Sequence, residues 1–228
     1  VSDIAEMSSE PITEIGFVVG HFGDEVEAEL IRIAESLGAA GSIHYQEEAL
    51  GTAHAILCAQ ELLSGKVIVA FADTLFRANF QLDEEKDGVM FVQQIDDPRQ
   101  FGVVQMDNDG HIEGFVEKPQ EFVSDLAMIG IYFFKDGAVL KTELQHLLDH
   151  NIIKGGEFQL PDALLNMTKK GMKLAVGQVD EWMDCGNKNA TVETNSKVLG
   201  YIEEELSIPD SAVMENSIVI PPCYIGEN

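Results

Sequence analysis

The 228-residue sequence predicts an α/β fold built on a mostly parallel sheet. Strand-like and helix-like segments alternate from Glu14 to Ala72, and this βαβαβ order implies parallel strands joined by right-handed crossovers. The run Val67–Phe71 is short, apolar and rich in β-branched residues, which is typical of a strand buried on both faces. An apolar share of 45% is enough for a full core.

In the first half, apolar residues at helical spacing separate short apolar runs. Gly38 suits the C-terminal end of the first long helix, and Thr52 is an N-cap candidate for the next. After a short helix-compatible start at Val1–Met7, the predicted elements are a strand at Glu14–Val19, a helix at Asp24–Leu37, a strand at Ser42–Gln46, a helix at Thr52–Leu63 and a strand at Lys66–Ala72.

In the second half, several strands follow one another with little helix between them. The turn Asn108-Asp109-Gly110 predicts a hairpin, and Pro161 fits an early position in a helix. The predicted strands are Val89–Ile95, Gly102–Met106, His111–Glu117, Met128–Phe134 and Met172–Val179, and the predicted helices are Ala138–Leu148, Leu160–Lys169 and Asn187–Leu199.

The C-terminal tail has a period of six, which is typical of hexapeptides in a left-handed β-helix. One coil cannot bury its own faces, because a solenoid is stabilised by stacking several repeats. We therefore predict that residues 201–228 are the first coil of a longer β-helix, or else a strand-like extension packed on the main body. The two apolar series are Ile208, Met214 and Ile220, and Val213, Val219 and Ile225.

The composition excludes several classes of function. A net charge of −26 without a basic stripe would repel nucleic acid phosphates. No apolar run is long enough for a membrane helix and no signal-peptide pattern opens the chain, which favours a cytoplasmic protein with no membrane partner. Cys58, Cys185 and Cys223 are scattered, which argues against a zinc site or a disulfide framework.

Asp73 follows the buried strand directly, at the strand end where ligands bind in open α/β sheets. For a lone aspartate in this place, a turn cap is the simpler interpretation. Four other motifs share the chain with it: QEEALGTA at Gln46–Ala53, FGVV at Phe101–Val104, FVEKP at Phe115–Pro119 and WMDCG at Trp182–Gly186.

Asp73, Asp184 and Lys118 form a plausible set for phosphoryl transfer. Two carboxylates can hold one Mg²⁺, which prefers few protein ligands plus phosphate oxygens, and a lysine can fix an anionic substrate. Glu117 and Lys118 would point to opposite faces of a strand unless the chain bends, which Pro119 encourages. The competing interpretation is a solvated ion pair on an edge strand.

The chain resembles the sugar-1-phosphate nucleotidyltransferase family, close to the glucose-1-phosphate thymidylyltransferases. The matching segments occur in family order and span most of the chain: Gln46–Ala53, Ala72–Phe76, Phe101–Val104, Glu117–Pro119, Ile129–Phe134, Gly156–Leu164 and Trp182–Gly186. The resemblance implies a Rossmann-like mixed sheet at residues 1–200, with β-hairpin insertions that close over a sugar.

The resemblance also implies a role for each matching residue. Packing in the core is the alternative for Tyr132, and capping a helix start is the alternative for Glu157. The implied roles are nucleobase contact for Gln46 and Gly51, Mg²⁺ binding for Asp73 and Asp184, binding of sugar hydroxyls or nearby groups for Gly102 and Glu117, sugar-phosphate binding for Lys118, and lining of the sugar pocket for Tyr132 and Glu157.

The implied reaction joins a nucleoside triphosphate, with dTTP or UTP favoured, to a sugar 1-phosphate, with glucose 1-phosphate favoured. The family usually assembles, which implies a homo-oligomer. The chain shows no counterpart of the family's first strand and glycine-rich phosphate loop, so we expect a fragment of a longer protein whose activity alone is an open question. A catalytically inactive sugar-nucleotide-binding subunit and a bifunctional nucleotidyltransferase/acyltransferase are the alternatives.

Overall fold

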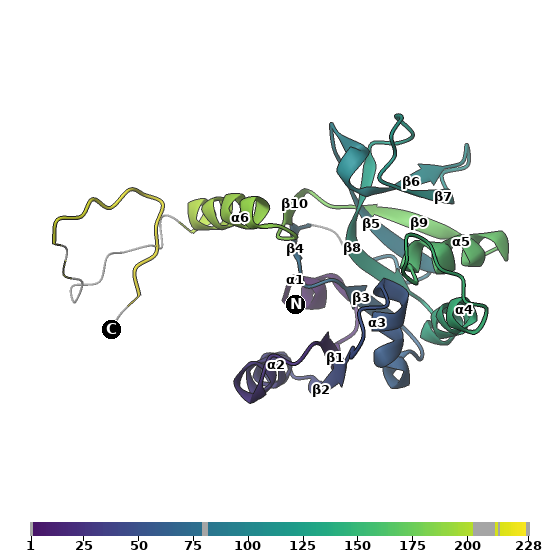
Figure 1. The fold of residues 1–228 in the computed structure, drawn as a ribbon, viewed down its shortest axis with the longest axis horizontal. Coiled ribbons are helices and arrows are strands. Elements are labelled where there is room, and N and C mark those ends of the chain that lie inside the picture. Colours follow the sequence, from purple (N-terminus) through teal and green to yellow (C-terminus); the bar gives the residue numbers. More distant parts are fainter. Residues whose placement is uncertain (1, 79–81, 203–212, 214, 227–228) are drawn as a thin grey trace. The chain divides into compact units, whose positions relative to one another are not determined.

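A computed structural model describes residues 2–78, 82–202, 213 and 215–226 (Figure 1). The chain divides into two compact units. The larger unit consists of Val1–Phe71 and Phe76–Glu181, and the smaller unit consists of Ala72–Leu75 and Trp182–Asn228. The two units are described separately below.

The main sheet of the larger unit has six strands in the order β7-β6-β8-β5-β9, with β3 also paired to β8. Only the β5–β9 pairing is parallel, whereas β8 runs antiparallel to β3, β5 and β6. The sheet is therefore mixed, as predicted, but the expectation that it is mostly parallel is wrong, because β8 runs against three neighbours. The strands are β3 (Val67–Ala70), β5 (Gly88–Gln94), β6 (Gly102–Met106), β7 (Ile112–Glu117), β8 (Leu126–Phe134) and β9 (Leu174–Gln178).

A second sheet in the larger unit contains β1 (Glu14–Val19) and β2 (Ala40–Tyr45), which pair in parallel. The helix between them, α2 (Asp24–Ser36), is the predicted crossover, and Gly38 follows it with φ of +78°. Gly41 of β2 lets α2 approach closely, since a Cβ there would lie 3.0 Å from the Cβ of Ala34. Within the described residues, β1 pairs only with β2.

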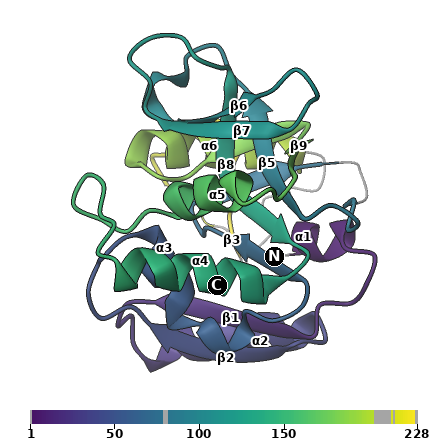
Figure 2. The same ribbon diagram turned by 90° about the vertical axis from the view of Figure 1, so that its right-hand side faces the viewer.

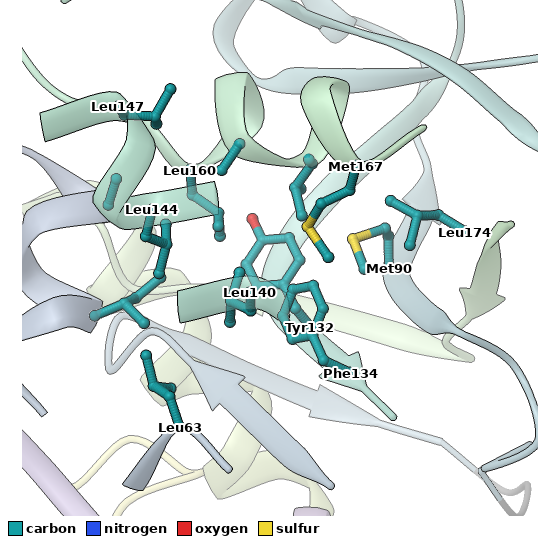
Figure 3. Packing of buried hydrophobic residues seen from close by; sticks show 14 of the residues in the cluster. Leu63, Met90, Tyr132, Phe134, Leu140, Leu144, Leu147, Leu160, Met167 and Leu174 are labelled. Atoms are coloured by element: carbon teal, nitrogen blue, oxygen red, sulfur yellow. The ribbon is translucent and has the colours of Figure 1, made fainter. Parts of the chain in front are cut away.

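The hydrophobic core lies between the main sheet and the helices α4 (Gly137–Asp149) and α5 (Leu160–Lys169), which lie side by side in Figure 2. Leu140 and Leu144 of α4 and Met167 of α5 are fully buried there, and Met90 contributes from β5 (Figure 3). Leu57 of α3 (Thr52–Cys58) extends the same cluster. The helix predicted over Thr52–Leu63 is interrupted at Ala59 and continues as the short 3₁₀ helix η1 (Gln60–Leu62).

A polar cluster ties the N-terminal helix α1 (Ser2–Met7) to the main sheet. The carboxylate of Glu84 accepts hydrogen bonds from the backbone N–H of Ser9 at 2.8 Å and from the Lys66 ammonium at 2.6 Å. Lys66 immediately precedes β3 and also donates to Glu10. The Lys66 and Ser9 hydrogen bonds lower the pKa of Glu84 to about 2.

The remaining elements include two short strands that were not predicted. β4 (Thr74–Arg77) and β10 (Glu181–Asp184) pair as a two-stranded sheet. The helix α6 (Lys188–Tyr201) follows, close to the predicted Asn187–Leu199, with the side chain of Asn187 as its N-cap. The 3₁₀ helix η2 (Pro98–Gln100) precedes β6.

No part of the β-helix predicted for the tail is found among the tail residues that the structure describes. Residues 203–212, 214, 227 and 228 of that prediction lie outside the described residues. Residues 215–226 contain bends and no strand, and the side chains of Ile218 and Ile220 are 89% and 77% exposed. A single coil has no stacked neighbour against which to bury such side chains.

None of the helices in the described part of the chain combines the length and the apolar composition needed to cross a membrane. Cys58, Cys185 and Cys223 are free thiols in the structure.

Candidate active site

Asp73 and Asp184 lie next to each other in the smaller unit. Asp73 immediately precedes β4, and Asp184 is the last residue of the paired strand β10. The backbone N–H of Cys185 donates to the carbonyl oxygen of Asp73 at 2.8 Å, which holds the two residues together through the main chain. The pairing of these two short strands therefore brings together carboxylates that are far apart in the sequence.

The carboxylates of Asp73 and Asp184 both lie close to Gly186. A Cβ built on Gly186 would lie 3.1 Å from Oδ1 of Asp184 and 3.4 Å from Oδ2 of Asp73. The N–H of Gly186 also donates to Asp184 Oδ1 at 2.8 Å, which fixes the orientation of that carboxylate. Two hard oxygen donors this near each other fit a small divalent cation that completes its shell with water and phosphate oxygens.

No group of three or more His, Cys, Asp or Glu side chains arranged for a metal occurs in the described residues. Asp73 and Asp184 alone therefore cannot complete the coordination shell of a metal ion. Such a donor set suits Mg²⁺, which usually keeps several waters and shares substrate phosphates, better than a structural zinc ion.

Helix α6 fixes the loop that carries Asp184. The hydroxyl of Thr194 donates to the carbonyl oxygen of Asp184 at 2.7 Å, and Thr194 is only 5% exposed. Thr191 donates to the carbonyl oxygen of Cys185 at 3.2 Å. Sequence reasoning missed Thr194, because a threonine inside a helix gives no sign of its tertiary partner. The N-cap Asn187 was the only signal that a helix begins directly after the aspartate.

The predicted base-contact residues lie together at the start of α3 in the larger unit. Gln46 Nε2 donates to the carbonyl oxygen of Gly51 at 3.1 Å and lies 3.0 Å from Nδ1 of His54. Gly51 is the N-cap of α3, with φ of +106°. Thr52 is therefore not the N-cap; its hydroxyl accepts from the N–H of Leu160 instead. His54 was not predicted, although it directly follows the Gln46–Ala53 motif in the sequence.

Glu157 lies beside Gly51. A Cβ on Gly51 would come within 2.8 Å of the Cβ of Glu157 and within 2.5 Å of the carbonyl oxygen of Phe158. Two backbone hydrogen bonds join these segments, from Phe158 to Leu50 and from Ala53 to Phe158. Glycine is thus required here for contact with residues 157–158. Gln159 is the N-cap of α5, so the capping alternative for Glu157 is wrong. The side chain of Glu157 is exposed.

Gly102, Glu117 and Lys118 form a third group at the edge of the main sheet. Gly102 of β6 pairs with Glu117 of the edge strand β7, and a Cβ on Gly102 would lie 2.8 Å from Glu117 Oε2. Lys118 has φ of +46°, so the chain bends there as the following Pro119 suggested. Its ammonium lies 3.9 Å from Glu117 Oε1, and 62% of its side chain is exposed. Such a loose, solvated pair contributes about 0–1 kcal/mol and leaves the ammonium available to an anion.

Tyr132 belongs to β8 and lies in the hydrophobic core. It is 4% exposed and packs among Leu140, Leu160 and Met167 in the core (Figure 3). Its ring also makes an edge contact with Phe71, at a centroid distance of 5.8 Å. The geometry favours the packing interpretation of Tyr132 over a place in the sugar pocket.

The chain belongs to the nucleotidyl transferase family, whose model matches residues 3–200. It is 29% identical over 238 residues to a glucose-1-phosphate thymidylyltransferase of Streptomyces antibioticus, covering 95% of this chain and 61% of the relative. It is 29% identical over 187 residues to the bifunctional protein GlmU of Methanococcus maripaludis, covering 78% of this chain and 44% of the relative. The chain thus spans only part of the length of the relatives it matches.

The fold is shared with solved structures at low sequence identity. The crystal structure of a nucleoside-diphosphate-sugar pyrophosphorylase from Vibrio cholerae superposes with a TM-score of 0.67 at 19% identity. The match covers 80% of each chain. At this identity the likeness supports the α/β fold with a mixed central sheet.

Proposed function

We propose that this chain carries out nucleotidyl transfer from a nucleoside triphosphate to a sugar 1-phosphate, giving a nucleotide-diphosphate sugar and pyrophosphate. The observation that carries the proposal is that the carboxylates of Asp73 and Asp184 both lie close to Gly186. Family membership sets the class of reaction, and the name of the Streptomyces antibioticus relative supports our choice of dTTP and glucose 1-phosphate as the first substrates to test.

The proposed reaction needs positioning and charge neutralisation more than covalent catalysis. A phosphate oxygen of the sugar 1-phosphate attacks the α-phosphorus of the triphosphate, and the bond to the pyrophosphate leaving group breaks in line. The nucleophile is already an anion, so no general base is required. When bound, Mg²⁺ supplies Lewis-acid stabilisation of the charge on the phosphate oxygens.

Each group of residues has a part in the proposal. Asp73 and Asp184 hold the cation, and the exposed ammonium of Lys118 pairs with the sugar phosphate. Gln46 contacts the nucleobase. The exposed carboxylates of Glu117 and Glu157 accept hydrogen bonds from sugar hydroxyls. Because the chain has a net charge of −26, the cation and Lys118 are needed to counter the repulsion of anionic substrates.

The test is pyrophosphate release in the presence of Mg²⁺, with a panel of sugar 1-phosphates and each of the common nucleoside triphosphates. The proposal expects release that requires both substrates and the metal, together with a nucleotide-diphosphate sugar detected by mass spectrometry. Binding of nucleotide sugar without turnover would instead indicate a regulatory subunit and would contradict the proposal.

A further inference from the structure

The side-chain amide of Gln46 is held in one orientation by its neighbours. Its nitrogen lies 3.1 Å from the carbonyl oxygen of Gly51, and a backbone carbonyl can only accept a hydrogen bond. The atom of Gln46 that faces Gly51 must therefore be Nε2. This assignment follows from chemistry alone, since the amide oxygen at the same place would face another oxygen.

The second hydrogen of the same amide is directed at His54. Nδ1 of His54 lies 3.0 Å from Gln46 Nε2 and must accept, because the nitrogen opposite it carries only hydrogens. Neutral imidazole can do this only as the tautomer with its proton on Nε2. His54 lies in the first turn of α3 and is partly buried, so the helix holds the ring in place.

Both amide hydrogens of Gln46 are thus used inside the protein, and its oxygen is left as a hydrogen-bond acceptor. A ligand that meets this oxygen must supply a donor. At the centre of the pairing edge, uracil, thymine and guanine carry a ring N–H. Adenine and cytosine present a nitrogen lone pair at that position, which an amide oxygen repels.

We propose that His54 is a positioning residue that fixes the Gln46 amide so that its oxygen selects bases with a ring N–H, namely uracil, thymine or guanine. This inference deepens the proposed function and rests on it, because it assumes that Gln46 faces the base. It narrows the substrate to nucleoside triphosphates whose base donates from the ring nitrogen. A role of both residues as a simple staple of the 46–51 loop predicts no such selection.

The first experiment examines, without any substrate, the hydrogen bonds that hold the Gln46 amide. In ¹⁵N NMR spectra of the whole chain at neutral pH, we expect His54 to be unprotonated at Nδ1 and the Gln46 side-chain amide protons to be protected from exchange. Replacement His54→Ala should release those protons, while His54→Asn should keep them protected, because its side-chain oxygen can accept near the place of Nδ1. A protonated Nδ1, or equal exchange in all three proteins, would overturn the proposal.

The second experiment measures binding of dTTP, N3-methyl-dTTP and ATP in the presence of Mg²⁺ by calorimetry. We expect both N3-methyl-dTTP and ATP to bind at least about tenfold more weakly than dTTP, since the amide oxygen loses its donor. His54→Ala should reduce this discrimination and His54→Asn should retain it. The control His150→Ala changes an exposed histidine at the C-cap of α4 and should match the wild type.

The outcomes separate the two proposals. If dTTP and its N3-methyl analogue bind equally well, the assignment to Gln46 and His54 is wrong, while the proposed transfer reaction stands. If no nucleotide binds at all, the proposed function fails and this inference fails with it.

Discussion

Gly186 provides the residue-scale test of the carboxylate pair. A methyl carbon at this position would lie 3.4 Å from Oδ2 of Asp73 and 3.1 Å from Oδ1 of Asp184. The φ of Gly186 lies outside the left-handed range, so alanine adds little backbone strain. We expect Gly186→Ala to weaken cation binding by about tenfold or more, through displacement of oriented ligands, with little loss of stability.

The matched control is Gly200→Ala, in the same unit, where a Cβ would meet nothing within 4 Å. It should bind the cation as the wild type does and should stabilise α6 slightly, because alanine favours a helix by about 1 kcal/mol over glycine. Isothermal calorimetry with Mn²⁺ measures both variants. Equal affinity of both variants for Mn²⁺ would show that the two carboxylates beside Gly186 bind no cation.

Glu84 should make stability depend on pH in the acid range. Its pKa is lowered from 4.5 to about 2 by the hydrogen bonds from Lys66 and Ser9. A lowered native pKa means that the unfolded state binds more protons, so the stabilisation is present above pH 4.5 and is lost as the pH falls toward 2. The Glu84 side chain is 10% exposed but the Lys66 side chain is 41% exposed, so solvent screens part of the interaction.

Urea unfolding of the wild type and of Glu84→Gln between pH 3 and 7 checks this prediction. Glutamine still accepts from Ser9 and Lys66 but does not titrate. The wild type should be the more stable protein near pH 7, and the difference should shrink as the pH falls. A difference that is constant across the range would mean that Glu84 keeps its ordinary pKa in the native state.

The sequence predicts which residues are candidates for the site better than it predicts the contacts that those residues make. The aspartates of WMDCG and FADT stand out as candidates, but nothing in the sequence reveals that β4 and β10 pair. Gly51 is predicted for close approach of a base, whereas the structure gives its space to Phe158. His54 and Thr194 are missed because their roles depend on partners that only the fold brings near.

At the scale of elements, α6 supports the Asp184 loop through one buried side chain. Replacement Thr194→Val keeps the shape of the side chain and removes its hydrogen bond to the carbonyl oxygen of Asp184. We expect a loss of about 1 kcal/mol of stability and weaker cation binding, since the loop is no longer fixed.

Thr142→Val on α4 is the control, because its hydroxyl bonds only to Ala138 of its own helix and is exposed. It should change neither quantity. Thermal unfolding and Mn²⁺ titration measure the two effects, and a Thr194→Val protein that retains full cation affinity would remove Thr194 from the account.

The junction between α3 and residues 157–158 should be intolerant of any side chain at Gly51. Its φ of +106° disfavours L-residues, and a Cβ would lie 2.5 Å from the Phe158 carbonyl oxygen. We expect Gly51→Ala to cost at least about 2 kcal/mol of stability. Gly20→Ala, where a Cβ meets nothing within 4 Å, should be nearly neutral. Chemical denaturation distinguishes them, and equal stability would refute the packing described here.

Elements with a strong local pattern could be predicted, and those defined by tertiary pairing could not. Glu14–Val19 and Leu160–Lys169 match their predicted bounds, and Asp107 closes the predicted hairpin by accepting from the N–H of His111. The four-residue strands β4 and β10 are too short for a period to be recognised. The direction of β8 depends on its long-range partners, so the predominance of antiparallel pairings in the mixed sheet was not foreseen.

At the scale of the whole molecule, charge and chemistry oppose each other. A protein with a net charge of −26 repels the phosphates that it is proposed to bind. We propose that local positive charge offsets this repulsion, and that Lys118 and a cation bound by the two carboxylates supply it. The cation site is therefore the central claim, and the proposed function depends on it.

The most direct test is Mn²⁺ binding followed by electron paramagnetic resonance, in the wild-type chain and in Asp73→Asn, Asp184→Asn and the exposed control Asp96→Asn. The account predicts one tight site in the wild type and in Asp96→Asn, and its loss in both other variants. If Asp73→Asn and Asp184→Asn bind Mn²⁺ as tightly as the wild type does, the carboxylate pair does not hold the metal and the central claim is wrong.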